Sequence, residues 1–178
     1  MTVFLKLIAT SALAIVSIQA WANDSSKNLA KPLAPLDLLS GSCWHGQFAG
    51  QEKTDTHCFI PIYGGAHILD RHRVDGGEGE YAGSSVYSWN PKEKRIEYVY
   101  FDSHGGVSRG WMKKTETGFS FPDETYLAAN GMERIISSRW LVSVDKWVQT
   151  ARENGRIVWQ VTYERKPLSD YPELSMQE

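Results

Sequence analysis

The chain has 178 residues, of which 19 are basic and 21 acidic, and its formal net charge at pH 7 is −2. A chain of this length has room for one domain with one hydrophobic core. Charges of both signs are interspersed, without the basic patch or stripe that binds nucleic acid, so we exclude a nucleic-acid partner.

Residues 1–22 have the pattern of a secretory signal peptide. Lys6 precedes a continuous apolar run, and Ala20-Trp21-Ala22 fits the small-x-small pattern that signal peptidase reads. We expect cleavage after Ala22 and a periplasmic or secreted product. The run is too short for a good membrane span, and no later segment approaches the roughly 20 apolar residues that a span needs, so we expect no transmembrane segment.

The remaining chain divides into three parts. Residues 23–35 are polar and contain proline, which predicts a flexible leader, and one short helical turn is expected at 36–39. Residues 36–167 form the predicted domain: about ten runs of strand length, rich in aromatic and β-branched residues, separated by turn signals. Residues 168–178 are expected to be a C-terminal tail.

No segment shows a long helical period, so the strands should form an antiparallel meander rather than βαβ units. A long meander has two unpaired edges, and closure into a barrel removes both. We therefore predict an all-β fold, an antiparallel up-and-down β-barrel of about ten strands. A two-sheet sandwich is the alternative.

The first two hairpins give a disulfide. A four-residue loop at 49–52 sets Cys43 opposite Cys58, and directly opposed residues have Cβ atoms about 4.5–5.5 Å apart. An even pair of cysteines in an exported chain indicates a disulfide rather than a metal site or a nucleophile.

The same hairpins bring polar side chains together on the other face. If Gly64-Gly65 is a two-residue hairpin loop, His57 lies opposite His72, and Phe59 opposite Asp70. The residues expected to share this face are Trp44, His57, Asp70 and His72.

A third hairpin adds a face of aromatic rings. A four-residue turn at 103–106 would pair Tyr100 with Arg109 and Tyr98 with Trp111. In the preceding hairpin, placing Asn90 opposite Arg95 pairs Tyr87 with Tyr98. We expect this face to form the interior, with Tyr87, Trp89, Tyr98, Tyr100, Arg109 and Trp111. Which face of the last hairpin, at Asn154-Gly155, points inward stays open.

A barrel of this size can hold packed side chains or one small ligand. An ordinary core would use aliphatic residues, because a buried polar group without a partner costs about 1–3 kcal/mol. An apolar lining with a few convergent polar groups is typical of ligand sites, and Arg109 favours an anionic group. The predicted ligand-binding residues are Trp44, His57, Asp70, His72, Tyr87, Trp89, Tyr98, Tyr100, Arg109 and Trp111.

Three other interpretations remain. The rings can be plain packing, with Arg109 neutralised by Asp70 or Asp102. The same cavity can serve an isomerase or cyclase with His57 and His72 as acid and base. A metal site is disfavoured, since no ligand spacing of a known zinc motif occurs, and we assign no metal or cofactor.

The segment LLSGSCWHG, residues 38–46, resembles the Gly-x-Trp opening of lipocalin and calycin barrels, although Ser42 occupies the glycine place. The resemblance implies a helical turn before the first strand and places Trp44 at the barrel base. The phrases HCFIPIYGG, DRHRV and YAGSSVYSWNP look like bacterial lipocalin-like proteins of unknown function, the DUF1579 group. The resemblance covers most of residues 36–166 and implies a calycin-type fold.

The nitrobindins, a related barrel family, share the Gly-x-Trp opening and bind haem through a histidine near the C-terminus. Here no histidine follows Phe119. Haem is therefore an alternative that the sequence disfavours.

Overall fold

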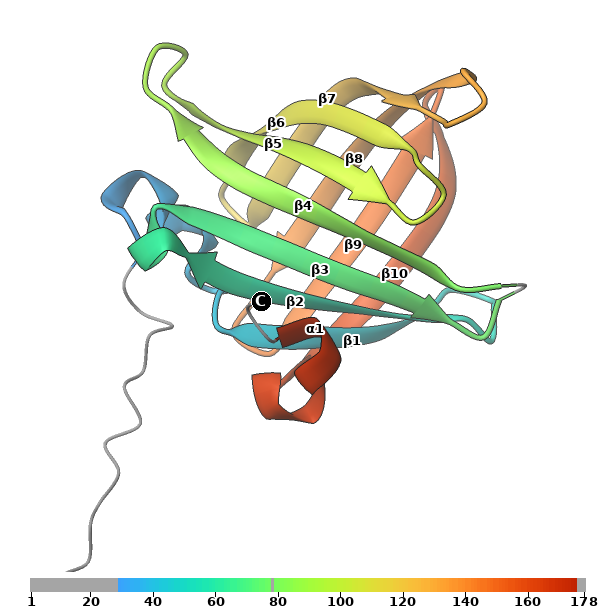
Figure 1. Cartoon of the computed structure of the whole chain (residues 1–178), viewed down its shortest axis with the longest axis horizontal. Helices are drawn as coiled ribbons and strands as arrows, with labels where there is room; N and C mark the ends of the chain where they lie inside the picture. The colour runs from blue at the N-terminus through green and yellow to red at the C-terminus, as the bar shows by residue number, and fades with distance from the viewer. Residues whose placement is uncertain (1–28, 78, 176–178) are drawn as a thin grey trace, which may run out of the picture.

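The computed structural model describes residues 29–77 and 79–175, which form a closed ten-stranded antiparallel barrel (Figure 1). The predicted signal peptide and cleavage site lie outside these residues. The strands are β1 Ser42–Phe48, β2 Thr54–Ile62, β3 His67–Asp75, β4 Tyr81–Asn90, β5 Arg95–Asp102, β6 Val107–Thr115, β7 Gly118–Leu127, β8 Glu133–Val142, β9 Lys146–Glu153 and β10 Arg156–Lys166.

Each strand pairs with its neighbours in the sequence, and β1 closes the barrel against β10, with Trp44 opposite Arg165. The predicted up-and-down barrel is confirmed, and the sandwich alternative is excluded. Because side chains alternate along a strand, one residue in two points into the barrel interior, or lumen.

One end of the barrel is closed by the chain that precedes β1. The 3-10 helix Lys31–Leu36 places Leu33 and Leu36 in the core, and Leu39 follows, all fully buried. The Trp44 indole donates its Nε1 proton to the carbonyl oxygen of Leu39 at 3.1 Å. The folded part therefore begins several residues before the predicted start at residue 36.

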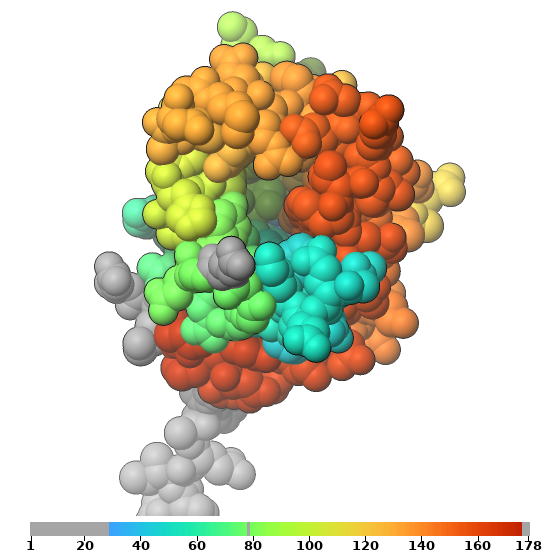
Figure 2. Space-filling view, turned by 90° about the vertical axis from the view of Figure 1, so that its right-hand side faces the viewer, coloured from blue at the N-terminus to red at the C-terminus, as the bar shows by residue number. Residues whose placement is uncertain are grey.

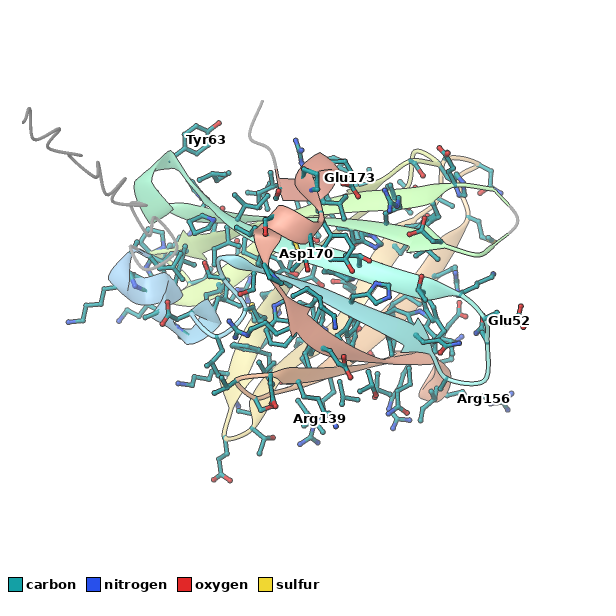
Figure 3. The ribbon with its side chains drawn as sticks, turned by 90° about the horizontal axis from the view of Figure 1, so that it is seen from below. Glu52, Tyr63, Arg139, Arg156, Asp170 and Glu173 are labelled. Carbon is teal, nitrogen blue, oxygen red and sulfur yellow. A yellow bond between two sulfur atoms is a disulfide. The ribbon has the colours of Figure 1, made fainter. Side chains whose placement is uncertain are left out.

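The first two registers are as predicted. Cys43 lies opposite Cys58 and forms a disulfide with it, and His57 lies opposite His72. The disulfide faces outward, where Leu174 packs against it from the helix α1, Pro172–Ser175. Figure 3 shows this C-terminal segment, with Asp170 and Glu173 labelled, against the outside of the barrel. Part of the predicted tail thus has an ordered place in the fold.

The predicted register between β5 and β6 is wrong by one residue. Asp102 pairs with Gly106 around a three-residue loop, and Gly105 adopts the left-handed conformation that such a loop uses (φ 84°). The Asp102 carboxylate secures the turn by accepting the backbone N–H groups of His104 and Gly106.

A shift of one residue moves every side chain of a strand to the other face. Arg109 and Trp111 therefore lie on the outside, where the Arg95 guanidinium stands 5.0 Å from the centre of the Trp111 ring. Ser108 and Gly110 take their places facing the lumen. The expected anion contact of Arg109 inside the barrel is lost with this correction.

The last hairpin resolves the face that the sequence left open. Asn154 and Gly155 both have positive φ, as a type I′ turn requires. Trp147 and Ala151 of β9 and Val161 and Tyr163 of β10 are buried in the interior. The adjacent Gln149 is buried with them.

The opposite end of the barrel is open. Figure 2 looks onto this end and shows a hollow bordered by the loops around residues 50, 104, 130 and 155. The interior near the closed end is filled by rings, with Trp140 and Trp147 4.7 Å apart between centroids and Trp147 stacked on Tyr163 at 4.2 Å. The hollow of Figure 2 therefore lies at the end of the barrel opposite these rings.

The neighbours Arg109 and Gly110 test the corrected register. We expect Arg109→Ala to change the free energy of unfolding by less than about 0.5 kcal/mol, because an exposed side chain on the outer face is removed. A Cβ at Gly110 would meet Glu124 Oε2 at 2.3 Å and the Tyr98 hydroxyl at 2.6 Å. Gly110→Ala should therefore destabilise by about 1–3 kcal/mol. Urea unfolding of both variants measures these changes. A larger loss of unfolding free energy in Arg109→Ala than in Gly110→Ala would favour the register predicted from the sequence.

Candidate functional site

The centre of the candidate site is the carboxylate of Asp55, which bridges two histidines. Alternation along β2 sends Asp55 and His57 into the lumen, and the pairing with β3 brings His72 beside His57. Asp55 Oδ2 lies 3.1 Å from His57 Nε2, and Oδ1 lies 3.1 Å from His72 Nδ1. The three residues are almost fully buried.

A second carboxylate, Asp70, contacts the other nitrogen of His57, with Nδ1 at 2.9 Å from Oδ1. Burial by itself would lower the pKa of His57, but the charges of Asp70 and Asp55 and their hydrogen bonds outweigh it and raise the pKa to about 10. Both nitrogens of His57 therefore donate, and the ring is an imidazolium near neutral pH. Burial opposes the ionisation of Asp55, yet the two histidines hold its pKa well below the ordinary value.

Tyr163 completes the surroundings of Asp55. Its hydroxyl donates to Asp55 Oδ2 at 3.0 Å. Burial, together with the charge of Asp55, raises the pKa of Tyr163 well above the ordinary value, so it remains a neutral donor. The buried carboxylate is thus satisfied by three donors, as burial of a charge demands.

A line of phenol groups leads from His72 toward the open end. His72 Nε2 lies 3.1 Å from the Tyr100 hydroxyl, which lies 2.6 Å from the Tyr81 hydroxyl. Burial raises the pKa of Tyr81 to about 12 and that of Tyr100 further. The Tyr126 hydroxyl of β7 donates to Asp102, at the end of β5, at 2.7 Å.

Glycines leave the space that these polar groups occupy. A Cβ at Gly83 would stand 2.5 Å from both His72 Nε2 and the Tyr100 hydroxyl. A Cβ at Gly106 would stand 2.1 Å from the Tyr126 hydroxyl. Any larger residue at either position would displace the hydrogen-bonded groups, so the lumen-facing glycines are part of the site.

Among the residues that the structure describes, Glu124 of β7 is the one carboxylate with a buried oxygen that has no hydrogen-bond partner. Oε1 accepts the Ser108 hydroxyl at 3.1 Å, whereas Oε2 is buried and has no hydrogen-bond partner. Burial raises the pKa of Glu124 to about 7. Its free oxygen can accept a hydrogen bond, and the ionised carboxylate can pair with a cation.

Eight of the ten predicted ligand-binding residues face the interior. Trp44 lies at the closed end, His57, Asp70 and His72 belong to the buried cluster, and Trp89 is half-buried beside the core. The tyrosines also face inward: Tyr87, Tyr98 and Tyr100. Arg109 and Trp111 were predicted wrongly, because the β5–β6 turn is one residue shorter than the sequence suggested. Neither Asp70 nor Asp102 therefore neutralises Arg109.

The sequence interpretation missed Asp55, Tyr81, Glu124, Tyr126 and Tyr163. Asp55 could have been predicted from the sequence, since it lies two residues before His57 and therefore on the same face of the strand. Glu124 and Tyr126 follow an irregularity in the β7 pairing between Phe121 and Glu124, which alternation alone cannot place. The remaining histidines, His45, His67 and His104, lie outside this cluster. His45 and His67 contact hydroxyl groups on the outer face.

Comparison with protein-family models and with curated proteins gives no match for this chain. The described residues include no helix with the length and apolar character needed to cross a membrane.

Glu124 predicts a pH dependence of stability. A carboxyl group whose pKa is higher in the folded than in the unfolded chain binds its proton more tightly when folded. Its contribution to stability is complete below about 4.5 and is lost as the pH rises through about 7. For wild type we expect a loss of at most about 3 kcal/mol from this group between pH 5 and pH 8.

Glu124→Gln keeps the shape of the side chain and removes the titration, so its unfolding free energy should fall less over the same interval. Urea unfolding at both pH values measures the difference. Glu116→Gln, at an exposed turn position, is the matched control. Identical pH dependence in wild type and Glu124→Gln would contradict the assignment.

Proposed function

We propose that the protein binds a small, partly apolar molecule in the open half of the barrel. The observation that carries the proposal is the buried, unpartnered Oε2 of Glu124 on the lumen side of the barrel. The open end of the barrel is hollowed (Figure 2). A buried polar atom left without a partner is costly, and a ligand donor would remove that cost. Aromatic rings around it supply the apolar contact surface.

The ligand's polar group is a hydrogen-bond donor or a cation. The polar groups of the open half are phenols and carboxylates: Tyr81, Tyr100, Asp102, Glu124 and Tyr126. The basis for an anionic ligand was Arg109, which lies outside the barrel. Carboxylates in an enclosed site repel anions and attract positive charge.

Export of the protein to an oxidising compartment is part of the proposal. The disulfide between Cys43 and Cys58 supports it, because such bonds persist in the periplasm and outside the cell. The signal-peptide pattern of residues 1–22 agrees with this location.

A second candidate function is acid–base catalysis at the same site. The hydrogen-bonded line from His72 through Tyr100 to Tyr81 favours it, because such a line can transfer a proton to the hollow. Binding is the better supported function, since both nitrogens of His57 are occupied by carboxylates and the ring cannot act as a base.

Native mass spectrometry of the protein purified from its host tests the proposal. Wild type should retain a small molecule. Glu124→Gln and Tyr100→Phe should each lower its occupancy, because each removes a polar contact in the open half. Arg109→Ala, on the outer face, is the control and should retain the molecule as wild type does.

Absence of any bound molecule from wild type, or equal occupancy in all four proteins, would show the proposal to be wrong. Turnover of the retained molecule that is lost in His72→Gln, with retention unchanged, would favour the catalytic alternative.

A further inference from the structure

We propose that Asp55, His57 and His72 bind one divalent transition-metal ion of the zinc class. One ligand atom from each residue lies within 4.8 Å of the others. Ligand atoms of a tetrahedral zinc ion, at bond lengths of about 2.0–2.2 Å, lie about 3.3–3.6 Å apart. The three side chains must therefore converge by up to about 1.5 Å to share an ion.

The donor set fits this class of ion. Two imidazole nitrogens and one carboxylate oxygen form a common three-residue zinc site, which leaves a further position for water or a ligand. Imidazole ligands favour zinc, copper, nickel or iron over calcium and magnesium, which prefer oxygen. The lack of a sequence motif does not argue against the site, because the barrel brings its residues together from two strands.

Each proposed ligand already has the outer partner that metal sites use to orient their ligands. The outward nitrogen of His57, Nδ1, lies 2.9 Å from Asp70, and that of His72, Nε2, lies 3.1 Å from the Tyr100 hydroxyl. Tyr163 donates to Asp55 at 3.0 Å. A carboxylate behind a histidine fixes the ring orientation and makes the opposite nitrogen a stronger ligand.

Charge also favours a divalent ion. Asp55 and Asp70 bring two negative charges into a buried cluster, and a proton on His57 offsets only one of them. One divalent ion that displaces this proton and is held by neutral imidazoles balances both carboxylates.

The present ring arrangement defines the change that binding requires. The rings of His57 and His72 are parallel, 4.6 Å apart between centroids and 10° between planes, and each faces a different oxygen of Asp55. One ring must turn so that both nitrogens point at a single ion. Trp147, whose ring centroid lies 5.1 Å from that of His57, can report the ion by fluorescence.

The ion has an approach from the open end. His72 keeps 8% of its surface exposed and contacts Tyr100, which in turn contacts Tyr81 near the hollow. The test of this site measures metal binding rather than retention of an organic molecule, and it includes Asp70→Asn, which the ligand test does not use. Either proposal can therefore fail alone.

The experiment uses the protein purified without a histidine tag, stripped with a chelator and titrated with Co²⁺, followed by competition with Zn²⁺. We expect one equivalent of Co²⁺, a visible absorption band of low-coordinate cobalt, quenching of tryptophan fluorescence, and loss of the band when Zn²⁺ is added. His72→Gln should abolish the band, and Asp70→Asn should weaken affinity by roughly ten- to a hundredfold.

His45→Gln and His67→Gln are the matched controls, because both histidines lie on the outer face and should leave binding unchanged. Circular dichroism checks that each variant folds, and Tyr100→Phe replaces His72→Gln if the latter does not. The proposal is overturned if wild type binds neither ion. It is also overturned if Asp70→Asn and the second variant, His72→Gln or its substitute Tyr100→Phe, both bind the ion as wild type does. Loss of binding in a control variant would equally overturn it.

Discussion

The contact on which the interior depends is the Asp55 carboxylate held between two imidazoles. A charged group in a barrel core is tolerated only when its oxygens are paired, and here His57, His72 and Tyr163 supply the donors. Asp70 then fixes the far side of His57. These residues come from β2, β3 and β10, and β1 lies between β2 and β10 where the barrel closes. The network therefore links the strands on both sides of β1. The same hydrogen bonds thus contribute to the stability of the barrel and to the geometry of the site.

The barrel separates packing from chemistry along its axis. At the closed end Leu33, Leu36 and Leu39 are fully buried in the core with Trp44. The Arg165 guanidinium lies 4.6 Å from the centre of the Trp44 ring. Toward the open end, glycines replace side chains on the lumen face and leave room for phenol and carboxylate groups. A binding site works best when rigid, well-packed elements hold its polar groups in place. Here the closed end supplies the packing and the open end carries the polar groups.

Much of this arrangement could be predicted from the sequence, because strand alternation and short turns fix registers once a loop is placed correctly. The Gly64-Gly65 loop and the loop at 49–52 gave the histidine pair and the disulfide. The register predicted from a four-residue turn at 103–106 was wrong. Gly105 alone of the two glycines takes the left-handed conformation, and Asp102 secures the shorter, three-residue loop. Strand alternation does not show which of two adjacent glycines will take that conformation. Glu124 lay beyond reach for a related reason, since the irregular β7 pairing changes the face of the residues after Phe121. Asp55 needed only the alternation already applied to His57. The likeness to the DUF1579 group remains a prediction.

The most direct test of this account is the protonation of the His57 ring in the metal-free protein, measured from its two ring ¹⁵N chemical shifts at neutral pH. The account predicts that both nitrogens carry protons, because each faces a carboxylate. A neutral His57 ring, with one nitrogen unprotonated, would mean that Asp55 is not the ionised centre of the network, and the account of the barrel interior would fail.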